Sequence, residues 1–261
     1  VDLAVMSALG EAVVSMPTVH VEIARLEAMA HQFDVAYLGR HVRWRRWGHG
    51  PALVLVHGGH GSWMHWVRNI EALMRNHAVW VPDLPGFGDS HAPAGDAHAP
   101  KRQQHLLDAV AATLETLVGR DAPIDLAGFS YGGLVAAELA TQRGHVRRLA
   151  LLGSAGHGGT RRQRAELLNW RSDDPVQMRN GLRHNLAAFM LHQPAAIDDL
   201  AMYVHETSCI QTRFRSKAIS RAGGLQAALD SYGGAVLLIW GEHDVTAVPH
   251  EVAPQIADQK T

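Results

Sequence analysis

IDLAGFSYGG, residues 124–133, is the stretch of sequence that decides the fold. Its first part, Ile124 to Ala127, is predicted to be a short strand that runs directly into the turn. The next part, Gly128 to Gly132, fits G-x-S-x-G, a pattern that requires a very tight turn from a strand into a helix. Such a turn lifts the hydroxyl of Ser130 clear of the sheet, and the glycines are needed because side chains there would clash. A Gly-Ser turn without chemistry is the alternative interpretation.

Apolar runs and helix-like spacing alternate on both sides of this turn. The alternation is typical of a mainly parallel sheet with helices on its faces, an α/β fold of the doubly wound kind. Buried strands are predicted at 52–56, 78–81, 146–152 and 235–240, and an edge hairpin at 33–38 and 41–47. Helices are predicted from Trp63 to Met74, from Leu107 to Val118, from Leu134 onward and over 249–257.

The alternation breaks after residue 156, where helical patterns follow one another without a clear strand. We expect a helical cap inserted between two central strands, above the strand ends. The expected domains are an N-terminal helical extension at 1–32, a first core part at 33–156, the cap at 157–234 and a second core part at 235–261.

Composition places the chain among ordinary globular proteins, with 261 residues, 47% of them hydrophobic and 19% charged. The net charge of -1 provides no general attraction to nucleic acid or to an anionic membrane, and no apolar run is long enough to span a bilayer. The single cysteine, Cys209, and a first segment without signal-peptide features favour a cytoplasmic location. The 18 histidines lack metal-ligand spacing, so no metal site is expected, and a homodimer is compatible with the sequence.

A glycine-rich turn, His57 to Trp63, closes the predicted strand at 52–56. An oxyanion hole is expected on this turn, because glycines let backbone N–H groups point into a site. We predict the Gly59 N–H and the Tyr131 N–H as donors, with His60 as the alternative to Gly59. One such donor contributes about 2.7–4 kcal/mol in the transition state. An ordinary glycine-rich turn is the competing interpretation.

Acidic residues follow two other predicted strands. Asp83 and Asp89 lie in a Pro- and Gly-rich bend that we interpret as structural. Asp244 comes just after the strand at 235–240, where a carboxylate can orient an imidazole beside Ser130. Asp244 is therefore the candidate triad acid, and Glu242 is its rival.

Four motifs in this order, HGGHGSW, DLPGFGDS, GFSYGG and WGEHD, resemble the α/β-hydrolase fold family. The long insertion is similar to the capped branch that includes meta-cleavage-product C–C hydrolases and related esterases. This resemblance implies a serine hydrolase that acts on a C–C bond or a carboxylic ester of a small carbonyl substrate, with a Ser-His-Asp triad and no cofactor. Serine at position 130 argues against epoxide hydrolases and haloalkane dehalogenases, which carry aspartate there.

The histidine of the triad has no evident position. In this family it follows the acid after one more helix and strand, whereas here only His250 follows Asp244. We assign neither His250 nor His243 as the base and expect the last strand and helix of the fold to be missing from this sequence. Either the histidine lies beyond Thr261, or the protein is a degenerate relative, such as a non-catalytic ligand-binding or receptor-like member.

Substrate contacts are predicted from the cap and from the glycine-rich turn. Phe189 and Met190 suggest an apolar wall, with His60 and Trp63 on the side of the turn. Met202 and Tyr203 extend this wall or form the core of the cap. Arg213 and Arg215 either pair with a substrate carboxylate or face solvent.

Overall fold

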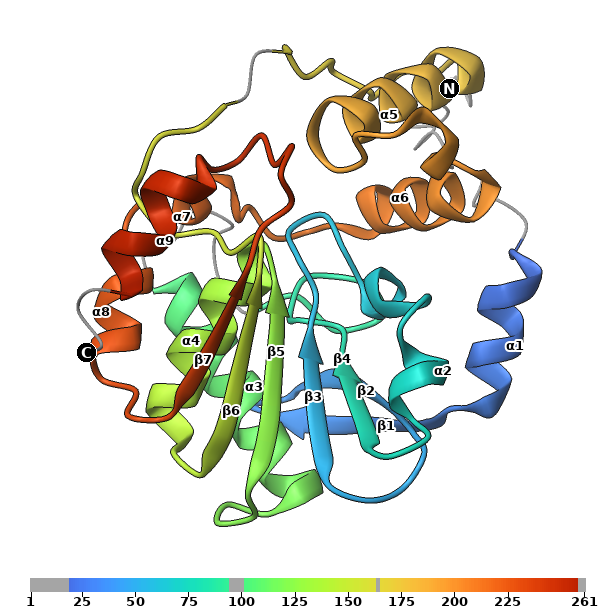
Figure 1. Cartoon of the computed structure of the whole chain (residues 1–261). Helices are drawn as coiled ribbons and strands as arrows, with labels where there is room; N and C mark the ends of the chain where they lie inside the picture. Colours follow the sequence, from blue (N-terminus) through green and yellow to red (C-terminus); the bar gives the residue numbers. More distant parts are fainter. Residues whose placement is uncertain (1–18, 94–100, 163–164, 258–261) are drawn as a thin grey trace, which may run out of the picture.

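The computed structural model describes residues 19–93, 101–162 and 165–257, which contain a seven-stranded sheet in the order β1-β2-β4-β3-β5-β6-β7 (Figure 1). The strands are β1 (His31–Tyr37), β2 (Arg40–Trp47), β3 (Ala52–Val56), β4 (Ala78–Pro82), β5 (Ile124–Phe129), β6 (Val146–Leu152) and β7 (Ala235–Ile239). Strands β3 to β7 pair in parallel, whereas β2 is antiparallel to both β1 and β4. The predicted α/β fold and its edge hairpin are thereby confirmed.

Alternate side chains of β3 enter two separate cores. Val54 and Val56 face a core formed with α3 (Arg102–Val118) and α4 (Tyr131–Arg143), while Leu53 and Leu55 face α1 (Val21–Met29). A strand covered on both faces must be apolar at successive positions, which explains the continuous apolar run at 52–56. In the part of the chain that the structure describes, no helix is long and apolar enough to cross a membrane.

The helix predicted from Trp63 to Met74 is not continuous. The structure has a 3-10 helix, η1 (Trp63–Trp66), and a single turn, α2 (Ile70–Leu73). The apolar stripe was interpreted correctly, since Trp63, Trp66 and Ile70 are all buried. The prediction of one continuous helix was wrong because the chain tightens at the break: the Val67 N–H donates to the Met64 carbonyl at 3.2 Å and the Asn69 N–H donates to the Trp66 carbonyl at 2.8 Å, each three residues back. The start of η1 is fixed by the Trp63 N–H, which donates to Asp83 Oδ1, and by the Met64 N–H, which donates to the hydroxyl of Ser62.

The cap consists of α5 (Pro175–Phe189) and α6 (Asp199–Gln211), which lie over the carboxyl ends of the strands (Figure 1). Their facing apolar side chains, including Leu182 and Met202, form a small core of their own. Two short helices follow, α7 (Lys217–Arg221) and α8 (Leu225–Asp230). Leu225 and Leu229 of α8 pack in the core beside α4, so the segment expected to be cap returns to the sheet before it ends.

Strand β7 differs from the sequence expectation. Its apolar run predicts cover on both faces, yet Leu237 is 57% exposed and Ile239 43% exposed. The helix α9 (Pro249–Ala257) places Val252 and Ile256 in the core on the opposite face. Among the described residues, Leu237 belongs to none of the hydrophobic cores, Ile239 lines a cavity, and β7 is the last strand of the sheet.

Candidate active site

Ser130 occupies the sharp corner between β5 and α4. Its backbone has φ 54 and ψ -120, a left-handed conformation that is unusual for a residue with a side chain. The corner is held on both sides: the Ser130 N–H donates to the Leu152 carbonyl at 2.8 Å, and the Ser130 carbonyl accepts from the Gly133 and Ala155 N–H groups at 2.9 Å. The strained conformation is thus fixed by β6 and by the first turn of α4.

The glycines around Ser130 are required by close packing. A Cβ on Gly128 would overlap the carbonyl of Gly132, and a Cβ on Gly132 would lie 2.5 Å from the Val56 carbonyl oxygen. A Cβ on Gly133 would lie 2.5 Å from Ser154 Oγ. Each separation is too short for a real carbon atom, so only glycine allows α4 to start this close to β3 and β6.

The glycine-rich turn after β3 lies against this corner. A Cβ built on Gly58 would be 3.2 Å from Ser130 Cβ, and one built on Gly59 would be 3.7 Å from Tyr131 Cβ. The predicted donors of Gly59 and Tyr131 therefore belong to backbone segments in direct contact. His60, the alternative donor to Gly59, follows it in the same turn and has a positive φ of 53.

Two buried imidazoles fix Gly58. The Leu84 N–H donates to His57 Nε2 at 2.9 Å, so the proton of that ring is on Nδ1 and is donated to the Gly58 carbonyl at 2.8 Å. The Gly58 N–H donates to His65 Nδ1 at 3.3 Å. Burial, together with the nearby imidazoles of His57 and other histidines, lowers the pKa of His65 to about 3. A neutral ring is the form that can accept this hydrogen bond.

Asp244 lies in the turn after β7, at the same end of the sheet. Its Oδ1 accepts from the Thr246 N–H and hydroxyl, both at 2.7 Å. Its Oδ2 is 3.1 Å from the position of a Cβ on Gly153, the residue after Leu152. Since Leu152 also binds the backbone of Ser130, acid and serine lie beside the same strand end. The rival Glu242 is exposed, and its backbone carbonyl accepts from Arg162 at 2.6 Å.

A cavity of about 820 Å³ opens between the strand ends and the cap. Most of the residues predicted for the site line it: Gly59, His60, Ser130, Tyr131, Phe189, Met190 and Asp244. Met202 does not line it, because its side chain is buried in the small core of the cap. Tyr203 faces a separate cavity on the side of α1.

Trp63 is the exception among the predicted substrate contacts. It is 3% exposed, lies outside this cavity, and packs against Trp47 at 5.5 Å between ring centroids. The guanidinium of Arg45 lies 5.0 Å from its ring centroid. The prediction that Trp63 contacts substrate is corrected: the tight η1 turn directs this aromatic ring into the core next to α1.

Of the histidines that the structure describes, four line the cavity: His60, His192, His205 and His243. Within residues 19–93, 101–162 and 165–257, no imidazole forms a hydrogen bond with Ser130 Oγ or with Asp244. Burial, with the nearby His60, lowers the pKa of His205 to about 4, so its ring is neutral at physiological pH. The proton acceptor for Ser130 is therefore not identified among the described residues.

The cationic residues of the cavity were not foreseen. Arg213 donates to the carbonyls of Gly88 and Ser90, which makes it a clamp on the Pro- and Gly-rich bend, and Arg215 is not among the lining residues. The cations that do line the cavity are Arg161, Arg171, Lys217 and Arg221. They come from irregular segments and from the short α7, where sequence periodicity carries no information on orientation. No cluster of three or more potential metal ligands occurs among the described residues.

Comparisons with known proteins identify the family of this chain. The profile of the Alpha/beta hydrolase family matches residues 53–260. A 2-hydroxymuconate semialdehyde hydrolase from Pseudomonas sp. (strain CF600) is 36% identical over 113 residues, which cover 42% of this chain and 38% of that protein. A pimeloyl-[acyl-carrier protein] methyl ester esterase from Xanthomonas campestris pv. campestris (strain B100) is 36% identical over 107 residues, which cover 40% of this chain and 37% of the esterase. The matched region thus spans less than half of each relative.

Solved structures resemble the chain over most of its length. The esterase RhEst1 from Rhodococcus sp. ECU1013 superposes with a TM-score of 0.69 at 22% identity, covering 89% of this chain and 86% of that one. The meta-cleavage product hydrolase CumD from Pseudomonas fluorescens IP01 superposes with a TM-score of 0.65 at 20% identity, covering 87% and 85%. At these identities the likeness concerns the fold alone.

Proposed function

Because the chain belongs to the alpha/beta hydrolase family, we propose that Ser130 is the nucleophile of a hydrolase acting on a small carbonyl substrate. The observation that carries this proposal is the backbone of Ser130, strained at φ 54 and located on the wall of a cavity of about 820 Å³. A strained backbone at a residue that lines a cavity is typical of functional sites. The start of α4 directly behind Ser130 favours the negative charge that develops during attack on a carbonyl.

In the proposed reaction, Ser130 Oγ attacks the carbonyl carbon while an imidazole takes the hydroxyl proton. The Gly59 and Tyr131 N–H groups bind the resulting oxyanion. Asp244 Oδ2, the carboxylate oxygen not engaged by Thr246, orients the imidazole. The imidazolium returns the proton to the leaving group, and water then releases the acid and regenerates Ser130. No described imidazole is assigned to this proton transfer.

Carboxylic-ester hydrolysis and C–C bond hydrolysis, the two reactions predicted from the sequence, both need this set of groups, and the relatives include a methyl ester esterase and a 2-hydroxymuconate semialdehyde hydrolase. The apolar wall supplied by Phe189 and Met190 suits a substrate with a hydrophobic portion. A location in the cytoplasm and a possible homodimer remain predictions from the sequence.

A second candidate function is the binding of a small ligand without turnover. The observation in its favour is that Ser130 and Asp244 lie on one cavity while no described imidazole bonds to either. Loss of the triad histidine lowers kcat about 10⁶-fold in a serine protease. A protein without this base would keep the pocket and lose nearly all turnover.

The deciding experiment measures hydrolysis of p-nitrophenyl acetate and p-nitrophenyl butyrate, with and without free imidazole, in the wild type and in Ser130→Ala. The proposal predicts a rate that depends on Ser130 in either condition. Rates that are equal in the two proteins under both conditions would exclude Ser130 as the nucleophile. A panel of vinylogous ring-fission diketones then separates C–C hydrolysis from ester hydrolysis.

Ligand binding is separated from catalysis by labelling. A fluorophosphonate forms a covalent bond with an activated serine, and mass spectrometry locates it. A label on Ser130 that is absent from Ser130→Ala supports the hydrolase. Tight binding of an acyl ligand by calorimetry, with no labelling and no turnover, supports the second candidate.

A further inference from the structure

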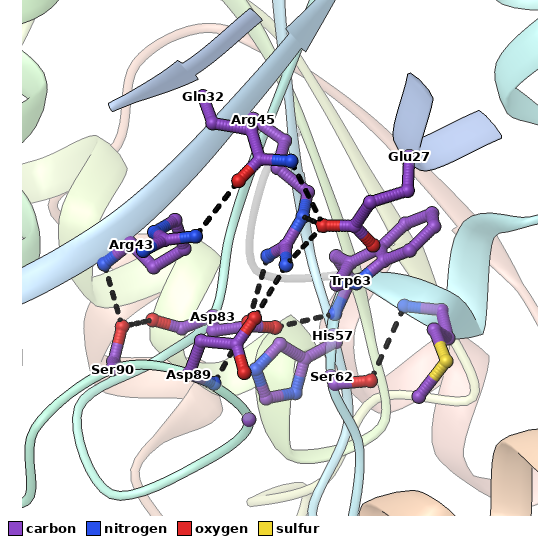
Figure 2. A network of polar contacts seen from close by, with 12 residues as sticks. Glu27, Gln32, Arg43, Arg45, His57, Ser62, Trp63, Asp83, Asp89 and Ser90 are labelled. Atoms are coloured by element: carbon purple, nitrogen blue, oxygen red, sulfur yellow. Dashed lines mark hydrogen bonds and ion pairs between the residues drawn. The ribbon is translucent and has the colours of Figure 1, made fainter. Parts of the chain in front are cut away.

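Arg45 is a cation buried between three carboxylates (Figure 2). It lies on β2 with its side chain 1% exposed. Its Nη1 donates to Asp83 at 2.9 Å, its Nη2 donates to Asp89 at 2.5 Å, and its Nε and Nη2 donate to Glu27 Oε1 at 2.8 and 2.7 Å. A charge this deeply buried needs such partners, because an unpaired one would cost several kcal/mol.

Asp83 extends this network to the glycine-rich turn. Its side chain is 1% exposed, and its Oδ1 accepts the Trp63 N–H at 2.7 Å (Figure 2). Trp63 ends the turn that begins at His57 and carries Gly59. The other end of this turn is held at Gly58 by the two imidazoles described above. Asp83 is thus the anchor at the far end of the backbone that presents Gly59.

Glu27 connects this anchor to the N-terminal helix. It lies on α1, which precedes the sheet, and its side chain is 32% exposed. Asp83 and Asp89 both come from the bend after β4, so Glu27 is the partner of Arg45 that comes from a different segment. The helix is also held by Leu26, whose carbonyl accepts from Trp47 Nε1 at 2.8 Å. The Arg45 guanidinium is therefore held by α1 through Glu27 and by the bend after β4 through the two aspartates.

We infer that Glu27 is a positioning residue for the glycine-rich turn that carries Gly59. It acts through Arg45 and Asp83 on the Trp63 N–H. The inference rests on the proposed function, because it assigns α1 a role in the same site. Without Glu27, Arg45 Nε loses its acceptor and Nη2 keeps only Asp89, so the guanidinium is free to turn about its bonds to the two aspartates, which shifts the anchor of the turn. A small displacement of an oxyanion donor weakens transition-state binding more than substrate binding.

The test compares Glu27→Ala with Glu22→Ala, a matched control on the same helix whose carboxylate binds the exposed Arg25. Glu27→Ala is expected to lower kcat roughly tenfold with KM within about twofold, since a misplaced catalytic group costs rate rather than affinity. Glu27→Gln keeps the oxygen that accepts from Arg45 and should recover most of this loss. The control should keep the wild-type kcat.

Amide hydrogen exchange over residues 58–64 is the second readout and needs no turnover. Glu27→Ala should raise exchange in this peptide while the strands β3 and β5 keep theirs. If wild-type turnover depends on Ser130 and Glu27→Ala changes neither kcat nor this exchange, the inference is wrong and the proposed function stands. If Ser130-dependent turnover is absent while exchange rises only in the turn, the contact pathway stands and the proposed function fails.

Discussion

Arg45 Nη1 lies 2.9 Å from Asp83 Oδ2, and both side chains are only 1% exposed. Breaking a buried ion pair destabilises a protein by about 3–5 kcal/mol when the remaining charge has no other partner. Asp83→Asn leaves Arg45 paired with Glu27 and Asp89 but removes the carboxylate acceptor of Arg45 Nη1, so it should lower the free energy of unfolding by about 1–3 kcal/mol, measured by urea denaturation. Asp34→Asn, which breaks the more exposed pair with Arg43, should cost about 1 kcal/mol or less. Equal losses in the two variants would contradict this interpretation.

Gly132→Ala should displace the corner at Ser130. The added methyl group would lie 2.5 Å from the Val56 carbonyl oxygen, and backbone cannot move aside as a flexible side chain can. We expect a loss of about 1–3 kcal/mol in stability together with loss of fluorophosphonate labelling. Gly223→Ala is the control, because its added methyl group meets no atom within 4 Å. Wild-type labelling of Gly132→Ala would show that the corner tolerates a side chain.

Stability should fall as the pH drops below neutral. Burial lowers the pKa of His65 to about 3 and that of His205 to about 4, whereas an unfolded histidine titrates near pH 6.5. The unfolded state therefore binds more protons throughout this window. The stability that these neutral, buried histidines contribute is fully present above about pH 6.5. It is lost as the pH falls toward their pKa values in the folded protein.

Each such histidine adds a slope of up to about 1.4 kcal/mol per pH unit. Urea denaturation at pH 7.5, 6.5 and 5.5 measures the slope, and His205→Gln should make it shallower by about one histidine's share. The same slope in His205→Gln and in the wild type would show that this ring is accessible to protons in the folded protein.

Cys209 should be unreactive in the folded protein. It is 4% exposed, and burial raises the pKa of its thiol to about 12. Because the thiolate is the reactive form, modification by a disulfide reagent at pH 8 should be at least about 100-fold slower in the native protein than in urea. Rapid native labelling at this residue would indicate that α6 separates from α5 or that the reagent reaches the thiol through the cavity that Cys209 lines.

The parallel strands and the grouping of Ser130, Gly59 and Asp244 were predictable from the sequence. Strand β3 is apolar at successive positions because helices cover both of its faces, so the apolar run alone located it. Strand β5 contains Asp125, which pairs with Arg147 and Arg148, and it was located by the G-x-S-x-G turn that follows it. Parallel strands end at one edge of the sheet, and residues that follow them therefore meet there. Physical reasoning on each short motif was sufficient for this part of the site.

The network around Arg45 was not predictable. Its carboxylates come from α1 and from the bend after β4, and no local pattern marks an arginine in an alternating strand as buried. Trp63 was misplaced for a related reason: an aromatic residue beside a glycine-rich turn fits a pocket and a core equally well. Only the η1 turn, set by hydrogen bonds to Asp83 and Ser62, decides between them.

The uncovered side of β7 has a consequence for how the molecule behaves in concentrated solution. Leu237 and Ile239 present apolar surface next to a row of main-chain amides and carbonyls that no described strand pairs with. Such an edge is a template for adding a strand from any source, including another molecule of the same protein. A segment that pairs along β7 would bury Leu237, and Leu237→Lys should weaken such pairing without changing the lining of the pocket, to which Ile239 belongs and Leu237 does not.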